Sequence, residues 1–165
     1  MDGKIQTNIS QPNTNMPATT STQFASSIAS GTDWRDTSKA VLEDLQAAKT
    51  AGQKFNLGFL YVSDFLAEDL EGILNLFKSV LEIESWVGSI GLGVCGNGKE
   101  YIDEPAISAL VGTVDEKDFK IFSGLDTNPD SSEVLENWLQ DTIPMMVLTH
   151  GNMADGETLM PMLSR

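Results

Sequence analysis

The stretch that decides the fold is Trp86-Val-Gly-Ser-Ile-Gly-Leu-Gly-Val-Cys-Gly-Asn-Gly-Lys-Glu100, followed by Pro105-Ala-Ile-Ser-Ala-Leu110. Its apolar start predicts a strand over residues 85–94. Its glycines remove side chains where the backbone must turn or be approached closely, and Asn97-Gly98 predicts a tight turn. A second apolar strand follows over residues 106–114, after an acidic connection.

The residues before this stretch predict a strand, a helix and a parallel crossover. Residues 55–62 are rich in aromatic and branched side chains, which indicates a buried strand. A long helix follows, whose apolar positions keep helical spacing: Leu66, Leu70, Ile73, Leu74, Phe77 and Leu81. A strand, a helix and a second strand in this order predict two parallel strands joined by a right-handed crossover.

The beginning of the chain divides into a polar tail and a strand with a helix. Residues 1–22 carry too little apolar surface to offset the entropy of ordering them, so we expect a disordered tail. Residues 24–31 suit an edge strand, and Thr32-Asp33 suits the cap of a helix that continues through Lys49.

The end of the chain predicts further alternation of strands and helices. We expect residues 106–114 and 119–123 to form an antiparallel hairpin around the charged turn at 115–118. A capping box at 130–133 predicts a helix, and a short strand at 145–149 and a helix at 155–163 follow. Residues 23–165 therefore form, by prediction, a single α/β domain with a mixed sheet, partly parallel and partly antiparallel, packed by helices.

Composition excludes several classes of partner. The 165 residues suffice for one globular domain, and 10 Lys and Arg against 24 Asp and Glu give a net charge of −14. This charge would repel nucleic acid and anionic lipid, so we expect neither a nucleic-acid nor a membrane partner. With no apolar run of membrane-spanning or signal-peptide type, we expect a cytoplasmic protein. One cysteine and one histidine give no zinc-ligand spacing.

No pattern of catalytic residues is evident. Gly91-Leu-Gly93-Val-Cys-Gly96 matches the dinucleotide fingerprint, but the chain continues as a turn toward a strand where that fingerprint needs a helix. His150 is the one credible base, and no G-x-S-x-G motif accompanies it. We therefore expect no enzyme and no required cofactor. His150 is a hydrogen-bonded structural residue or, as an alternative, an axial ligand of haem.

Several motifs together resemble a known family. Asp33-Trp-Arg35, Asp69-Leu70, and the spacing from Trp86-Val-Gly-Ser89 through Gly93, Gly96, Gly98 and Glu100 to Pro105-Ala-Ile-Ser108 are similar to the N-terminal part of FIST domains. The resemblance covers roughly residues 24–165. It implies a cytoplasmic sensory input module of signal transduction that binds small ligands such as amino acids. Some members of the family bind haem and respond to nitric oxide. FIST proteins normally continue into a C-terminal region, so a second FIST half, another copy or a signalling protein is the implied partner.

Candidate ligand-binding residues follow from side-chain chemistry within this stretch. Gly88 and Gly93 would allow close approach of a ligand to the backbone, Ser89 could donate or accept a hydrogen bond, and Glu100 could pair with an ammonium group. Three hypotheses result. They are a non-enzymatic sensor of a small ligand, a haem-based nitric oxide sensor that uses His150, and a protein-interaction or scaffold domain that docks a partner through its acidic surface and methionine-rich end.

Overall fold

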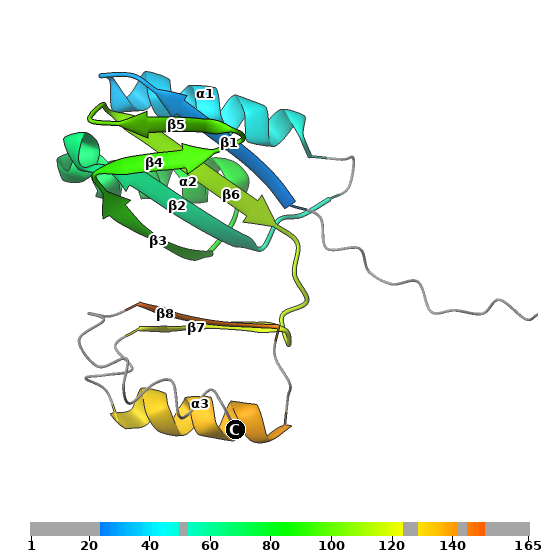
Figure 1. The fold of residues 1–165 in the computed structure, drawn as a ribbon. Helices are drawn as coiled ribbons and strands as arrows, with labels where there is room; N and C mark the ends of the chain where they lie inside the picture. The colour runs from blue at the N-terminus through cyan, green and yellow to red at the C-terminus, as the bar shows by residue number, and fades with distance from the viewer. Residues whose placement is uncertain (1–23, 50–52, 124–128, 142–144, 151–165) are drawn as a thin grey trace, which may run out of the picture.

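The computed structural model describes residues 24–49, 53–123, 129–141 and 145–150 (Figure 1). Within them lie three α-helices, one 3₁₀-helix and eight strands. In chain order these are β1 (Phe24–Ser30), α1 (Trp34–Ala47), β2 (Leu57–Ser63), η1 (Asp64–Asp69), α2 (Leu70–Leu81), β3 (Ser85–Gly91), β4 (Gly93–Gly96), β5 (Lys99–Ile102), β6 (Ala106–Gly112), β7 (Phe119–Ser123), α3 (Pro129–Asp141) and β8 (Met146–His150).

A four-stranded mixed sheet in the order β1-β6-β2-β3 is the centre of the fold. Strand β6 pairs antiparallel with both β1 and β2, whereas β2 and β3 are parallel. The predicted α/β class, the mixed sheet, the parallel crossover and the edge position of β1 are confirmed.

Helices α1 and α2 cover one face of this sheet (Figure 1). Their fully buried side chains Val41, Leu45, Ile73 and Phe77 meet the inward residues of β2 and β6 in the main core. The predicted cap of α1 is confirmed, because the Asp33 carboxylate accepts hydrogen bonds from the backbone N–H groups of Arg35 and Asp36 at 2.8 and 3.1 Å.

The long helix predicted from Leu66 to Leu81 is in fact two elements. The chain forms the 3₁₀-helix η1 first, departs from helical geometry at Leu66 (φ −111°, ψ 15°), and enters α2 at Leu70. Leu66 is nevertheless buried in the main core. Spacing alone could not reveal the break, because a 3₁₀ turn and an α turn both bring residues three apart to the same side.

Strand β3 is anchored by Trp86, which lies across Gly58 of β2. The indole Nε1–H donates to the carbonyl oxygen of Ile83 at 2.8 Å, and the ring meets Phe77 edge-on at a centroid distance of 5.8 Å. A Cβ at Gly58 would overlap the indole ring. Gly58 is therefore the gap in β2 that lets Trp86 reach the main core.

The single strand predicted over residues 85–94 is broken. Strand β3 ends at Gly91, and after Leu92 the chain leaves the central sheet to form β4, which pairs with β5 in a separate antiparallel hairpin. The tight turn predicted at Asn97-Gly98 is confirmed, with φ values of 49° and 72°. Two successive positive φ values are the requirement of the two-residue hairpin turn that Asn-Gly favours.

The predicted hairpin between residues 106–114 and 119–123 is wrong. Strand β7 pairs with β8, in parallel, in a two-stranded sheet of its own. The physical reason is that β6 already has a partner on each of its two edges, β1 and β2, so no hydrogen-bonding edge is left for β7.

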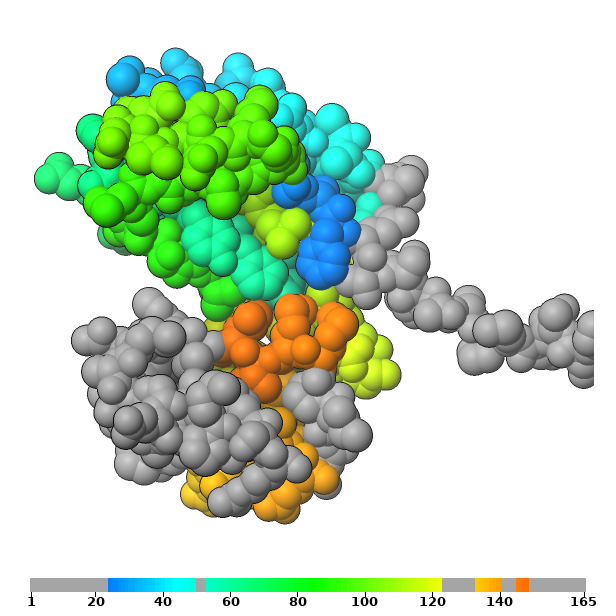
Figure 2. All heavy atoms as spheres, viewed as in Figure 1, coloured from blue at the N-terminus to red at the C-terminus, as the bar shows by residue number. Residues whose placement is uncertain are grey.

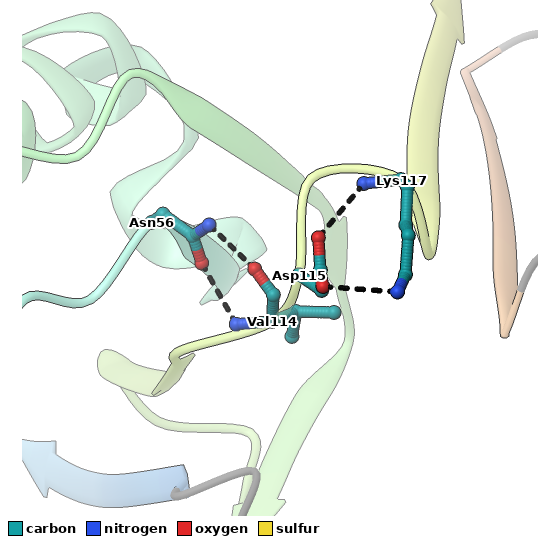
Figure 3. A network of polar contacts seen from close by, with 4 residues as sticks. All are labelled: Asn56, Val114, Asp115 and Lys117. Carbon is teal, nitrogen blue, oxygen red and sulfur yellow. Dashed lines mark hydrogen bonds and ion pairs between the residues drawn. The ribbon is translucent and has the colours of Figure 1, made fainter. Parts of the chain in front are cut away.

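The connection from β6 to β7 is clamped by Asn56 (Figure 3). Its side-chain amide donates to the carbonyl oxygen of Val114 at 2.7 Å, and its side-chain oxygen accepts from the Val114 N–H at 2.9 Å. Next to this clamp, Asp115 and Lys117 form an exposed ion pair at 3.3 Å. The backbone N–H and then the ammonium group of Lys117 hold the pKa of Asp115 below its usual value.

The β7–β8 pair forms a layer with two packed faces. Phe119 and Ile121 of β7, with Met146 and Leu148 of β8, lie against Leu57, Phe59 and Val114. On the other face, Phe122 lies near Trp138 of α3, with a centroid distance of 6.2 Å. The helix predicted from the capping box and the strand predicted at 145–149 are thus present, as α3 and β8. Helix α3 begins at Pro129, one residue before the predicted capping box. The predicted tail 1–22 and the helix 155–163 lie outside the described residues.

We expect Gly58→Ala to destabilise the domain by about 1–3 kcal/mol, because the added methyl group would overlap the Trp86 indole in a packed core. Urea unfolding of the single variants and of Gly58→Ala/Trp86→Leu measures the coupling between the two sites. The penalty of Gly58→Ala should shrink when Trp86 is replaced by the smaller leucine. An equal penalty in both backgrounds would show that Trp86 is not the obstacle.

Candidate functional site

The face of the central sheet that the helices do not cover carries an exposed strip of side chains. Strand register places two neighbouring rows there: Ser26, Leu110, Phe59 and Val87 in one, and Ile28, Ser108, Tyr61 and Ser89 in the other. Ile28 and Ser108 are buried, whereas Tyr61 is 44% exposed and Ser89 is exposed. We call the six accessible residues the Tyr61 strip: Ser26, Phe59, Tyr61, Val87, Ser89 and Leu110.

Two structural units border this strip. The β4–β5 hairpin packs on one part of the face through Val94 and Tyr101, which contact Ile28 and Ala106. The β7–β8 pair packs on another part, around Leu57 and Phe59. Figure 2 shows atoms of β1, β2 and β6 at the surface between the green hairpin and the orange β8. Phe59 of the strip also contacts the β7–β8 layer, whereas Tyr61 and Ser89 remain exposed.

Hydrogen bonds fix the hairpin in place. The side-chain amide of Asn97 donates to the carbonyl oxygen of Ser26 at 2.7 Å, and the Ser26 hydroxyl donates to the side-chain oxygen of Asn97. Behind the turn, the Ser108 hydroxyl donates to the carbonyl oxygen of Cys95 at 3.1 Å. One border of the strip is thus pinned to both β1 and β6.

The strip combines an aromatic surface with hydroxyl groups. Tyr61 lies opposite Ser89 on the neighbouring strand, and Phe59 and Leu110 lie half-buried beside them. The aromatic rings offer a face to an ammonium group or an apolar side chain, while the hydroxyls donate and accept hydrogen bonds. The strip therefore presents polar and apolar groups side by side on one sheet face.

The four ligand-binding residues expected from the sequence do not share one surface. Only Ser89 lies on the Tyr61 strip. Gly88 takes part in the close approach of β3 to β2, because a Cβ there would overlap the carbonyl oxygen of Leu60. Gly93 and Glu100 lie on the outer side of the hairpin, since the residues next to them in the chain, Val94 and Tyr101, face the sheet. Glu100 is exposed there, turned away from the strip.

Sequence reasoning did not single out Tyr61 and Phe59. Residues 55–62 were expected to be buried on both faces, because they form an almost continuous apolar run. The signal that could have found them is the alternation in Leu57-Gly-Phe-Leu-Tyr-Val62, where every second residue is larger and aromatic toward the end. Period-two alternation separates the two faces of a strand, and here it places Phe59 and Tyr61 on the open face.

His150 is the last residue of β8, and its backbone lies in register with Ser123 of β7. Its side chain lies outside what the structure describes. The described side chains of the β7–β8 pair are engaged on both faces, against the central sheet and against α3. Haem ligation by His150 therefore gains no support from them and stays a prediction. Within the described ranges, no three His, Cys, Asp or Glu side chains are grouped so that they could hold a metal ion.

The comparisons with known proteins assign no family. No protein-family model, no curated protein and no solved structure matches this chain. The resemblance to FIST domains accordingly stays a prediction from the motifs. In the part of the chain that the structure describes, no helix is both long enough and apolar enough to cross a membrane.

We expect Asn97→Ala to loosen the hairpin, because it removes the hydrogen bonds to Ser26 and leaves a residue with a Cβ at positive φ. The left-handed conformation alone costs an alanine roughly 1–2 kcal/mol. Hydrogen exchange of residues 93–102 should accelerate most in Asn97→Ala and less in Asn97→Gly, which loses the same hydrogen bonds but tolerates the turn. Equal exchange in both variants and the parent would contradict this role of Asn97.

Proposed function

We propose that this protein is a non-enzymatic, cytoplasmic sensory input domain of signal transduction, which binds a small ligand such as an amino acid on the Tyr61 strip. The observation that carries the proposal is the exposed pair Tyr61 and Ser89 on an otherwise covered sheet face. The resemblance to FIST domains favours the same class of function.

The chemistry of the strip supports an amino-acid-like ligand. An ammonium group is attracted to an aromatic face by about 0.5–2 kcal/mol, depending on how far it is desolvated. The net charge of −14 raises the local concentration of cationic groups around the protein. The Ser89 hydroxyl, next to Tyr61, offers a hydrogen bond to the polar end of the same molecule.

The strip also favours binding over catalysis. Its six residues are aromatic, aliphatic or hydroxyl-bearing, and none of them is a His, Asp, Glu or Lys, the side chains that most often act as general bases. A serine becomes a nucleophile only where an adjacent base takes its proton, and in the register Ser89 has the phenol of Tyr61 beside it. Recognition without bond making is therefore the function that these side chains suit best.

The β4–β5 hairpin, which borders the strip, could transmit the ligand-bound state to other proteins. The hairpin is held to β1 through the Asn97 and Ser26 pair, both of which are exposed. Since Ser26 itself belongs to the strip, a ligand that contacts its hydroxyl would compete with Asn97. Binding on the strip and the position of the hairpin would then be coupled through this one pair.

We expect a free amino acid, or another small ammonium compound, to raise the thermal midpoint of the protein in a dose-dependent way, because a ligand that binds only the folded state stabilises it. Tyr61→Ala should weaken the apparent affinity by about tenfold, the ratio that corresponds to ~1.4 kcal/mol. Ser89→Ala should weaken it less.

Phe65→Ala is the matched control, because Phe65 is an aromatic residue of η1 with 57% exposure that lies outside the strip. It should leave the midpoint shift unchanged. If no free amino acid and no small ammonium compound shifts the midpoint of a protein that unfolds cooperatively, the proposed function is overturned. An equal loss of apparent affinity in Tyr61→Ala and Phe65→Ala would contradict a binding site on the strip.

A further inference from the structure

The two edges of the central sheet differ in how they are protected. On β1, the side chain of Asn97 binds the carbonyl oxygen of Ser26. On β3, residues 85–91 pair with β2 along one edge, and no described strand pairs with the other edge. An unpaired edge presents a row of free N–H and C=O groups that can accept a further strand.

Strand β3 lacks the residues that usually keep such an edge single. Its sequence, Ser-Trp-Val-Gly-Ser-Ile-Gly, holds no charged residue and no proline over seven positions. Ile90 is 43% exposed on it, and Leu92, directly after its end, is 75% exposed. Natural proteins protect free edges with charges, prolines or bulges, so an unprotected edge with exposed apolar residues indicates a surface that pairs.

We propose that two copies of this chain pair through β3, edge to edge and antiparallel, about a twofold axis at Gly88. This is the register that pairs all seven residues, with Gly88 opposite Gly88 of the second copy. The two central sheets would then join into one sheet of eight strands, which lies within the usual size of open sheets. The interface goes beyond the proposed ligand site and does not depend on it.

The absence of charge on β3 permits a second copy to approach there. Each chain carries a net charge of −14, so two copies can meet only where no acidic side chains oppose one another. Strand β3 is such a place, because none of its residues is charged. For the same reason it offers nothing to attract a basic partner, whereas an uncharged strand pairs equally well with itself.

Side-chain matching supports this register. Trp86 and Ile90 both lie on the helix face of the sheet, beside Gly58 and Val62 of β2. In the antiparallel pair each Ile90 lies opposite the Trp86 of the second copy. The Trp86 side chain is half-buried in one chain and retains surface that Ile90 can cover. A branched side chain opposite an aromatic one is a favourable cross-strand pair. A closed twofold pair also leaves no β3 edge free for further addition.

Sedimentation velocity over a range of protein concentrations tests the proposal directly. We expect a concentration-dependent dimer. It should strengthen between about 0.01 M and about 1 M NaCl, because the Debye length falls from about 30 Å to about 3 Å and the repulsion between the acidic chains is screened. A complex held by opposite charges would weaken instead, so a dimer that weakens with salt overturns the proposal.

Two edge variants and one control locate the interface. Ile90→Lys and Ser89→Lys place a charge on opposite faces of β3, and the second removes no buried apolar group. Each should raise the dimer dissociation constant by at least about tenfold. Val134→Lys is the control, since Val134 is also branched, is 46% exposed and lies on α3. It should leave the dimer intact.

Two further outcomes overturn the β3 dimer: a monomer at every concentration and salt, or a dimer that persists in Ser89→Lys with an unchanged circular dichroism spectrum. A failure of the ligand proposal has a different signature. Tyr61→Ala would leave the sedimenting mass unchanged whether or not it alters ligand binding, because Tyr61 belongs to β2, away from the β3 edge.

Discussion

The fold depends on the fact that a strand has two hydrogen-bonding edges and that β6 uses both. Strand β6 lies between β1 and β2. Strand β1 therefore shares a sheet with the parallel β2–β3 unit only through β6. Because both edges of β6 are occupied, the chain after Gly112 cannot fold back along β6. Asn56 then directs the exit by binding both backbone groups of Val114, and the β7–β8 layer packs near the beginning of β2.

Local signals in the sequence predicted most elements correctly. Asp33 could be predicted as a cap and Asn97-Gly98 as a turn because a few neighbouring residues decide these features. The parallel crossover followed from element order and handedness. The failed hairpin prediction depended on non-local information. Whether residues 119–123 return along β6 depends on the occupancy of the β6 edges by β1 and β2, and no pattern within the 115–118 turn carries that information.

The candidate site likewise could be predicted only in part from local sequence. The glycine-rich stretch 86–100 is continuous in sequence, but the break at Leu92 sends its halves to different layers. Ser89 remains on the central sheet, whereas Glu100 lies on the outer side of a hairpin. The two glycines that suggested access for a ligand have structural roles instead, because a Cβ at Gly88 would overlap Leu60 and one at Gly93 would crowd Tyr101. The aromatic residues that define the strip come from a strand whose apolar run concealed its two faces.

The sheet order also determines when the domain can fold. In the β1–β6 pairing Phe24 lies opposite Gly112, a separation of 112 − 24 = 88 residues. Contacts that close such long loops make folding slow compared with local pairing. On a ribosome, β1, α1, β2 and α2 would all emerge before the strand that unites them. Until residue 112 has been synthesised, the inner surfaces of these elements have no complete sheet to cover, and the core of the nascent chain stays unfinished.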